Sequence, residues 1–170
     1  MATTYKLIDK AILTGSQSSV SFTGLGAYSS DYTDLLVRVS GRTDRSATFD
    51  NLNIGFNSST SNFSGCVLVG YGSSGYESGT ATGLIASINS ATSTSNTFTS
   101  ADTYIPNYSS SNYKSFSSDA TNENNDGFAV AFLGAGLWSN TAAITSISLS
   151  SSSGNFVQYS TAYLYGVKNA

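Results

Sequence analysis

The chain has 170 residues, of which only 10% are charged, and its formal net charge is −3. Seven Lys and Arg residues cannot supply the basic footprint that phosphate binding needs, so a nucleic-acid partner is excluded. Histidine is absent, which excludes Ser-His-Asp and Cys-His triads and zinc sites with imidazole ligands. The length suits one domain over residues 1–170, large enough to bury a core without disulfides or metal.

The first half of the chain predicts short β-strands with a period of two. Tyr32–Ser40 places Leu35, Val37 and Val39 on one face, and Asn51–Asn57 alternates apolar with polar residues in the same way. Three further strands are expected at Val20–Thr23, Phe63–Tyr71 and Leu84–Ile88. Tyr5–Leu13 fits either a strand or a short helix.

The second half predicts more strands, ending with the longest β-favouring run in the chain. Phe128–Leu133 is typical of a buried strand that closes at Gly134–Gly136. Asn155–Val167 is apolar or aromatic on both parities, which predicts a central strand with a packed layer over each face. Weaker strand patterns occur at Thr97–Tyr104, Tyr113–Phe116 and Ala143–Leu149.

These elements predict an all-β protein. About eight to ten short strands are separated by polar turns, and no window has helical periodicity over ten or twelve residues. The expected fold is a single-domain antiparallel β-sandwich. Jelly-roll topology is favoured, because the Cys…Trp…Cys pattern of immunoglobulin domains is missing.

Several segments match a catalytic, cofactor or metal motif by letters, but the residues around each match do not fit the site that the motif requires. Gly70–Gly75 matches G-x-G-x-x-G by letters, but no helix follows it to hold a pyrophosphate, so a loop is expected. Asn122–Gly127 resembles half of an EF-hand loop, but its twelfth position is leucine, and only a weak calcium site of another kind stays open. The only glutamates, Glu77 and Glu123, are not paired for glycosidase chemistry. We expect no enzyme activity, cofactor or metal, and we expect Cys66 to pack as a small hydrophobe.

Six residues are candidates for partner binding. Arg42 and Arg45 lie in the polar loop 41–50, which could dock carboxylates of a partner or simply form internal ion pairs. The other four are aromatic residues in or near predicted loops, as sugar sites and protein interfaces both use: Tyr71, Tyr76, Tyr108 and Trp138. For Trp138 a core position is equally open.

Four segments together carry a resemblance that covers most of the chain: Tyr32–Arg42, Leu52–Asn57, Gly136–Leu149 and Ser160–Val167. In this order they resemble the small jelly-roll structural proteins found in virions of tailed bacteriophages, particularly marine and cyanobacterial ones. Such proteins serve as head decoration (cement) proteins or as tail and fibre tips, commonly as trimers. The family carries no shared catalytic residues to transfer.

The expected function is therefore that of a capsid decoration protein on the outer surface of the virion. A charge-poor surface has little repulsion to keep copies apart, which favours packing against itself or a large partner. The resemblance implies a homotrimer that clamps neighbouring major capsid protein subunits. One alternative is a tail- or fibre-associated module that binds a receptor or a host surface glycan, and another is a capsule-degrading enzyme. No secretory leader and no membrane insertion are expected.

Overall fold

The computed structural model describes residues 4–124 and 129–168 and contains twelve strands and one short 3₁₀ helix within them. In chain order these elements are β1 (Tyr5–Ile12), β2 (Ser19–Phe22), η1 (Leu25–Tyr28), β3 (Asp34–Gly41), β4 (Phe49–Phe56), β5 (Phe63–Tyr71), β6 (Ser74–Thr80), β7 (Leu84–Asn89), β8 (Thr99–Ile105), β9 (Lys114–Glu123), β10 (Ala129–Trp138), β11 (Ile147–Ser151) and β12 (Thr161–Val167).

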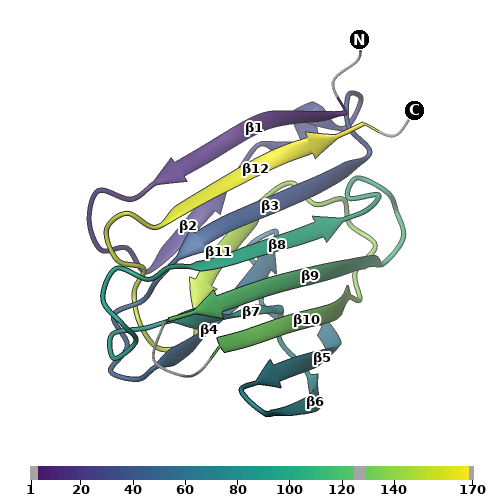
Figure 1. Ribbon diagram of the computed structural model, residues 1–170. Helices are drawn as coiled ribbons and strands as arrows, with labels where there is room; N and C mark the ends of the chain where they lie inside the picture. The colour runs from purple at the N-terminus through teal and green to yellow at the C-terminus, as the bar shows by residue number, and fades with distance from the viewer. Residues whose placement is uncertain (1–3, 125–128, 169–170) are drawn as a thin grey trace.

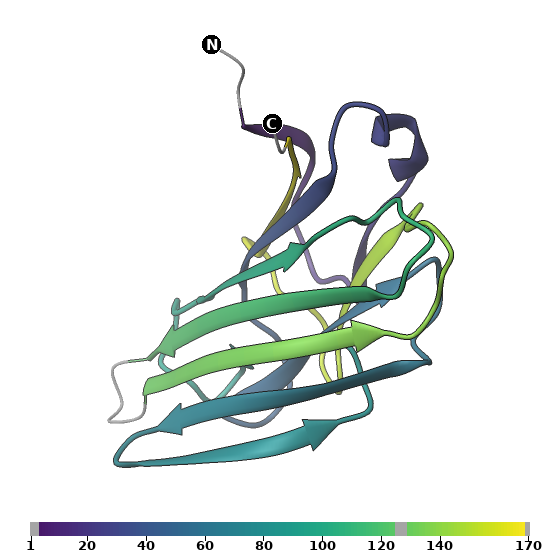
Figure 2. The same cartoon turned by 90° about the vertical axis from the view of Figure 1, so that its right-hand side faces the viewer.

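The strands form two sheets in which all neighbours are antiparallel, which confirms the predicted all-β sandwich. An eight-stranded sheet has the order β1-β12-β3-β8-β9-β10-β5-β6, which Figure 1 shows from top to bottom. A four-stranded sheet behind it has the order β2-β11-β4-β7. The small sheet is half as wide as the large one, so β5 and β6 lie at an overhanging end (Figure 2).

Eight of the strands follow a regular alternation between the sheets. With the pairs β5–β6 and β9–β10 set aside, the remaining orders are β1-β12-β3-β8 and β2-β11-β4-β7. Along these eight strands the chain changes sheet at every connection except that from β4 to β7. This order is compatible with the predicted jelly roll. The two additional pairs widen one sheet only.

Three strands, β6, β9 and β10, differ from their predicted form. Strand β6 was expected to be loop, but its Gly- and Ser-rich backbone pairs along β5 from Thr80 to Ser74. Strand β10 was expected to end before Gly134, yet it continues to Trp138. Gly136 belongs in this strand because the Phe116 ring lies against it: a Cβ there would be 2.1 Å from the ring. Strand β9 is also longer than predicted.

The last strand is shorter than the run that predicted it. It begins at Thr161, because Tyr159 has a φ of 71° and breaks the extended backbone. Phe156 instead forms isolated bridges with Gln17 and Thr43. Strand β12 does lie between β1 and β3, as a central strand should. Only its inner face is fully buried, however, so the prediction of a layer over both faces was wrong.

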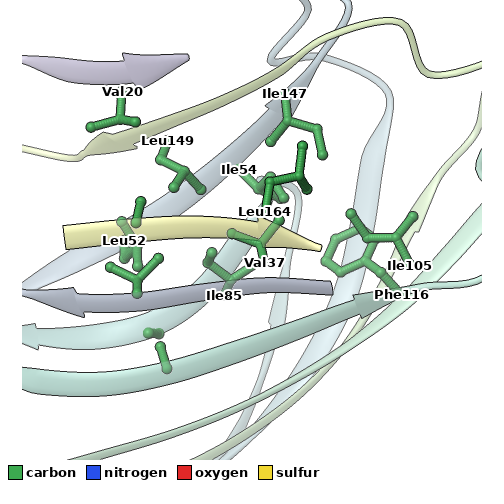
Figure 3. Close-up of a cluster of buried hydrophobic side chains, with 14 of the residues drawn as sticks. Val20, Val37, Leu52, Ile54, Ile85, Ile105, Phe116, Ile147, Leu149 and Leu164 are labelled. Atoms are coloured by element: carbon green, nitrogen blue, oxygen red, sulfur yellow. The ribbon is translucent and has the colours of Figure 1, made fainter. Parts of the chain in front are cut away.

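One contiguous hydrophobic cluster fills the space between the sheets. Figure 3 shows Val37 and Leu164 of the large sheet beside Leu52, Ile54 and Leu149 of the small sheet. An aromatic group continues this core toward β5 and β10, where the Phe56 and Trp138 rings are 5.5 Å apart. The core therefore holds the large sheet by its inner face and leaves the outer face to solvent.

Candidate functional site

The outer face of the large sheet is the broadest surface that no described element covers. Burial alternates along its strands, with every second residue of β9 exposed and the intervening residues buried. Strand β10 alternates in the same way from Ala129 to Ala135. Because side chains of a strand point to opposite faces in turn, the exposed positions form rows across the sheet. The register defines which residues share a row.

Two neighbouring rows contain the distinctive side chains of this face. The first row, read from β1 to β6, is Leu7, Tyr165, Leu36, Tyr104, Ser117, Ala135, Cys66 and Gly79. The second row is Lys10, Tyr163, Arg38, Asp102, Asp119, Leu133, Leu68 and Glu77. One half of the face is thus aromatic and charged, and the other half contains leucines and small side chains, with Glu77 at its edge.

The apolar half centres on two leucines that are opposite each other in register. Leu133 of β10 is 56% exposed and Leu68 of β5 is 54% exposed. Ala131 and Ala135 flank Leu133 on the same strand and are also exposed. We call these four residues the leucine patch. Contiguous exposed apolar surface of this kind marks interaction sites in soluble proteins.

The aromatic half contains a groove of about 470 Å³. Its lining residues, which we call the tyrosine groove, are Tyr5, Leu36, Arg38, Asp102, Tyr104, Ser117, Asp119 and Tyr165. Arg38 donates from Nε and Nη2 to the two carboxylate oxygens of Asp102 at 2.8 and 2.6 Å. This hydrogen bond and the charge of Asp102 raise the pKa of Arg38, so the guanidinium stays protonated.

Arg42 is buried, so the prediction that it docks a partner was wrong. It is only 8% exposed, and its guanidinium donates to the carbonyl oxygens of Ala91, Ser93, Thr94 and Thr97 at 2.8–3.3 Å. Burial lowers the pKa of Arg42. The side chain holds the turn between β7 and β8, which approaches the loop 41–50 only in the folded chain.

Arg45, Tyr71 and Tyr76, by contrast, lie close together, which the sequence did not predict. They line a second groove, of about 320 Å³, on the inner side of the overhanging β5–β6 end. Arg45 is 43% exposed and donates to the Phe49 carbonyl at 3.0 Å, and it lies 3.7 Å from buried Asp50. The Phe49 and Tyr71 rings meet edge to face at 5.9 Å. Partner binding by these three residues stays a prediction.

Tyr108 and Trp138 are core residues, so the prediction that they bind a partner was wrong. Both are fully buried. The Tyr108 hydroxyl donates to the Leu25 carbonyl at 3.2 Å, which joins the chain after β8 to η1. Trp138 packs on Phe56 and Phe63. For Trp138 the core position that the sequence left open is the one observed. Tyr108 looked exposed because it lies in a polar stretch, but long-range packing decides its position.

The buried Tyr108 hydroxyl predicts a specific loss of stability in alkali. Desolvation, with a smaller effect of the Asp31 charge, raises the pKa of Tyr108 above its ordinary 10.0. The folded chain therefore keeps this proton to higher pH than the unfolded chain. The contribution to stability is complete below about pH 10 and is lost as pH rises through the folded pKa.

Tyr108→Phe should accordingly lose less stability than the unmodified protein between about pH 9 and about pH 11. Thermal unfolding of both proteins at the two pH values checks this. Burial lowers the pKa of Lys114, which also titrates at alkaline pH. Because both proteins contain Lys114, its effect does not change the difference between them. Equal losses in the two proteins would contradict the assignment of the alkaline effect to Tyr108.

The remaining expectations concern metal, thiol and membrane sites. Among the residues that the structure describes, no group of three or more acidic or cysteine side chains could hold a metal ion. Residues 125–127 of the Asn/Asp-rich turn, where a weak calcium site stayed open, lie outside the described residues.

Cys66 is exposed on the outer face and does not pack as a small hydrophobe, contrary to the prediction. No described helix has the length and apolar character to cross a bilayer.

Sequence reasoning missed the leucine patch and the tyrosine groove. Comparison with known proteins finds no family model, curated protein or solved structure that matches the chain. One signal for the patch was present: in the run from Phe128 to Leu133, Val130 and Phe132 share one parity, and Ala129, Ala131 and Leu133 share the other. The groove had no local signal, because its residues come from five strands.

Proposed function

We propose that this chain is a non-enzymatic structural protein of a bacteriophage virion, and that it decorates the capsid. The observation that carries the proposal is the leucine patch: an open sheet face with two half-exposed leucines among alanines and glycines. Small side chains let another backbone approach closely, and the leucines supply apolar area to bury. The resemblance of the sequence segments to phage virion proteins gives the biological setting.

In this proposal the preformed sandwich contacts copies of itself and the major capsid protein. The outer face provides the coat contact, and homotrimers join neighbouring coat subunits on the outer surface of the head. A protein that binds only the assembled shell stabilises that shell by mass action, with no chemical step. Arg45, Tyr71 and Tyr76 form a second contact surface beside the same overhanging end of the sheet.

Quantitative mass spectrometry of purified particles from the source phage tests the proposal. We expect a copy number comparable to that of the major coat protein. A few copies per particle would move the protein to the tail or a fibre and would contradict decoration. Absence from particles would overturn the structural role altogether.

A second candidate function is recognition of a receptor by a tail- or fibre-associated module. The observation that favours it is the tyrosine groove, which combines aromatic rings with an ion pair fixed in place. The copy number separates this candidate from decoration, because receptor-binding tips are present in few copies.

A further inference from the structure

The tyrosine groove is an open, concave part of the outer face with room for a small ligand. Its volume of about 470 Å³ lies within the usual range for small-molecule sites. It runs across β1, β12, β3, β8 and β9, which lie side by side in Figure 1. It adjoins the leucine patch, because Asp119 and Ser117 of the groove lie opposite Leu133 and Ala135 of β10.

The aromatic side chains of the groove form two platforms across the strands. Tyr165 and Tyr104 flank Leu36 in one row, each one strand away from it. Tyr163 stacks beside Tyr165 with the ring centroids 6.5 Å apart, and the Tyr104 hydroxyl donates to buried Asp34. The Tyr104 ring is thus held in place before a ligand arrives, which lowers the entropic cost of binding.

Polar groups lie in the neighbouring row, directly beside these rings. The bidentate Arg38–Asp102 pair uses Nε and one hydrogen of Nη2, so the remaining guanidinium hydrogens can still donate. Asp119 stands opposite Asp102 on β9, and Ser117 stands opposite Tyr104. Carboxylate oxygens that accept and guanidinium hydrogens that donate are together complementary to adjacent hydroxyls, each of which both donates and accepts.

The charge of the groove decides which hydroxylated ligand it suits. Arg38 contributes one positive charge, and Asp102 and Asp119 contribute two negative charges. The balance of −1 repels phosphate, sulfate and carboxylate groups. A neutral sugar avoids this repulsion, places its hydroxyls on the polar row and packs its apolar C–H face on tyrosine.

We propose that the tyrosine groove binds a neutral hexose unit of a polysaccharide. Tyr165 supplies a stacking surface, and the Arg38–Asp102 pair with Asp119 fixes the hydroxyls. The inference specifies the ligand class for the receptor-binding candidate, but it does not depend on where in the virion the protein lies. A decoration protein with this groove would also attach particles to neutral glycans.

A glycan array of neutral, sialylated and sulfated oligosaccharides tests the inference with the purified full chain. We expect reproducible binding to neutral hexose glycans and none to the acidic ones. Titration of the best neutral hit should show about tenfold weaker binding for Tyr165→Ala and a several-fold loss for Asp119→Asn. Tyr113→Ala, which removes an exposed tyrosine outside the groove, should bind as the unmodified protein does.

Thermal unfolding of each variant shows whether a loss of binding comes from a loss of fold. No neutral hit, a preference for acidic glycans, or binding that survives Tyr165→Ala in a folded protein would each overturn the inference. The particle copy number is measured independently, so a failed glycan test leaves the decoration proposal standing. A failed copy-number test equally leaves the glycan site standing.

Discussion

Arg42→Ala is expected to lower the free energy of unfolding by about 3 kcal/mol, a large part of the stability of a domain of this size. The guanidinium donates to four carbonyl oxygens in the turn that follows β7, and also to the Thr97 hydroxyl at 3.2 Å. Alanine would leave these acceptors without their shared donor. A charged donor to several partly buried acceptors is worth more than a neutral one.

Urea unfolding of Arg42→Ala and Arg45→Ala checks this expectation. Arg45 comes from the same loop but is 43% exposed, and its removal should cost no more than about 1 kcal/mol. Arg42→Lys should fall between the two, since an ammonium can reach only some of the carbonyls. Equal small losses for Arg42→Ala and Arg45→Ala would show that the turn does not depend on the buried guanidinium.

Leu133→Lys is expected to weaken binding to capsids at least tenfold while the chain stays folded. Burying a leucine is worth about 1.5–3 kcal/mol, and an interface would have to desolvate the new ammonium instead. In the free chain the lysine would lie opposite Asp119, a favourable pair across neighbouring strands. Its effect on thermal unfolding should therefore be small.

Co-sedimentation with particles that lack the protein measures this binding. Tyr113→Lys is the matched control, because Tyr113 is similarly exposed but lies outside the leucine patch. The control should bind as the unmodified chain does. If Leu133→Lys also keeps full affinity, the leucine patch is not the coat contact.

Local periodicity predicted most strands, because apolar alternation alone indicates a half-buried strand. It failed for β6, whose Gly and Ser residues have no apolar face and which is held by pairing with β5. It also failed at Gly136, where a strand interior needs glycine to admit the Phe116 ring. Both failures depend on contacts between strands that no single window of sequence contains.

The candidate sites were harder to predict than the fold. Arg45, Tyr71 and Tyr76 were predicted as partner-binding residues because exposed arginine and tyrosine near loops are common in interfaces. Arg42 looked equivalent to Arg45 in sequence, and only the carbonyls some fifty residues further along the chain distinguish it. The tyrosine groove needs the register of strands from both ends of the chain, which alternation does not provide.

The overhanging end of the large sheet has a consequence for local unfolding. None of the residues in β6 is buried, and its only neighbour in the sheet is β5. Such a strand can open while the rest of the sheet stays paired, so its amide hydrogens should exchange with solvent long before those of β9. A partner on the leucine patch would add a second layer to this end and slow that exchange, so local order and assembly would be coupled.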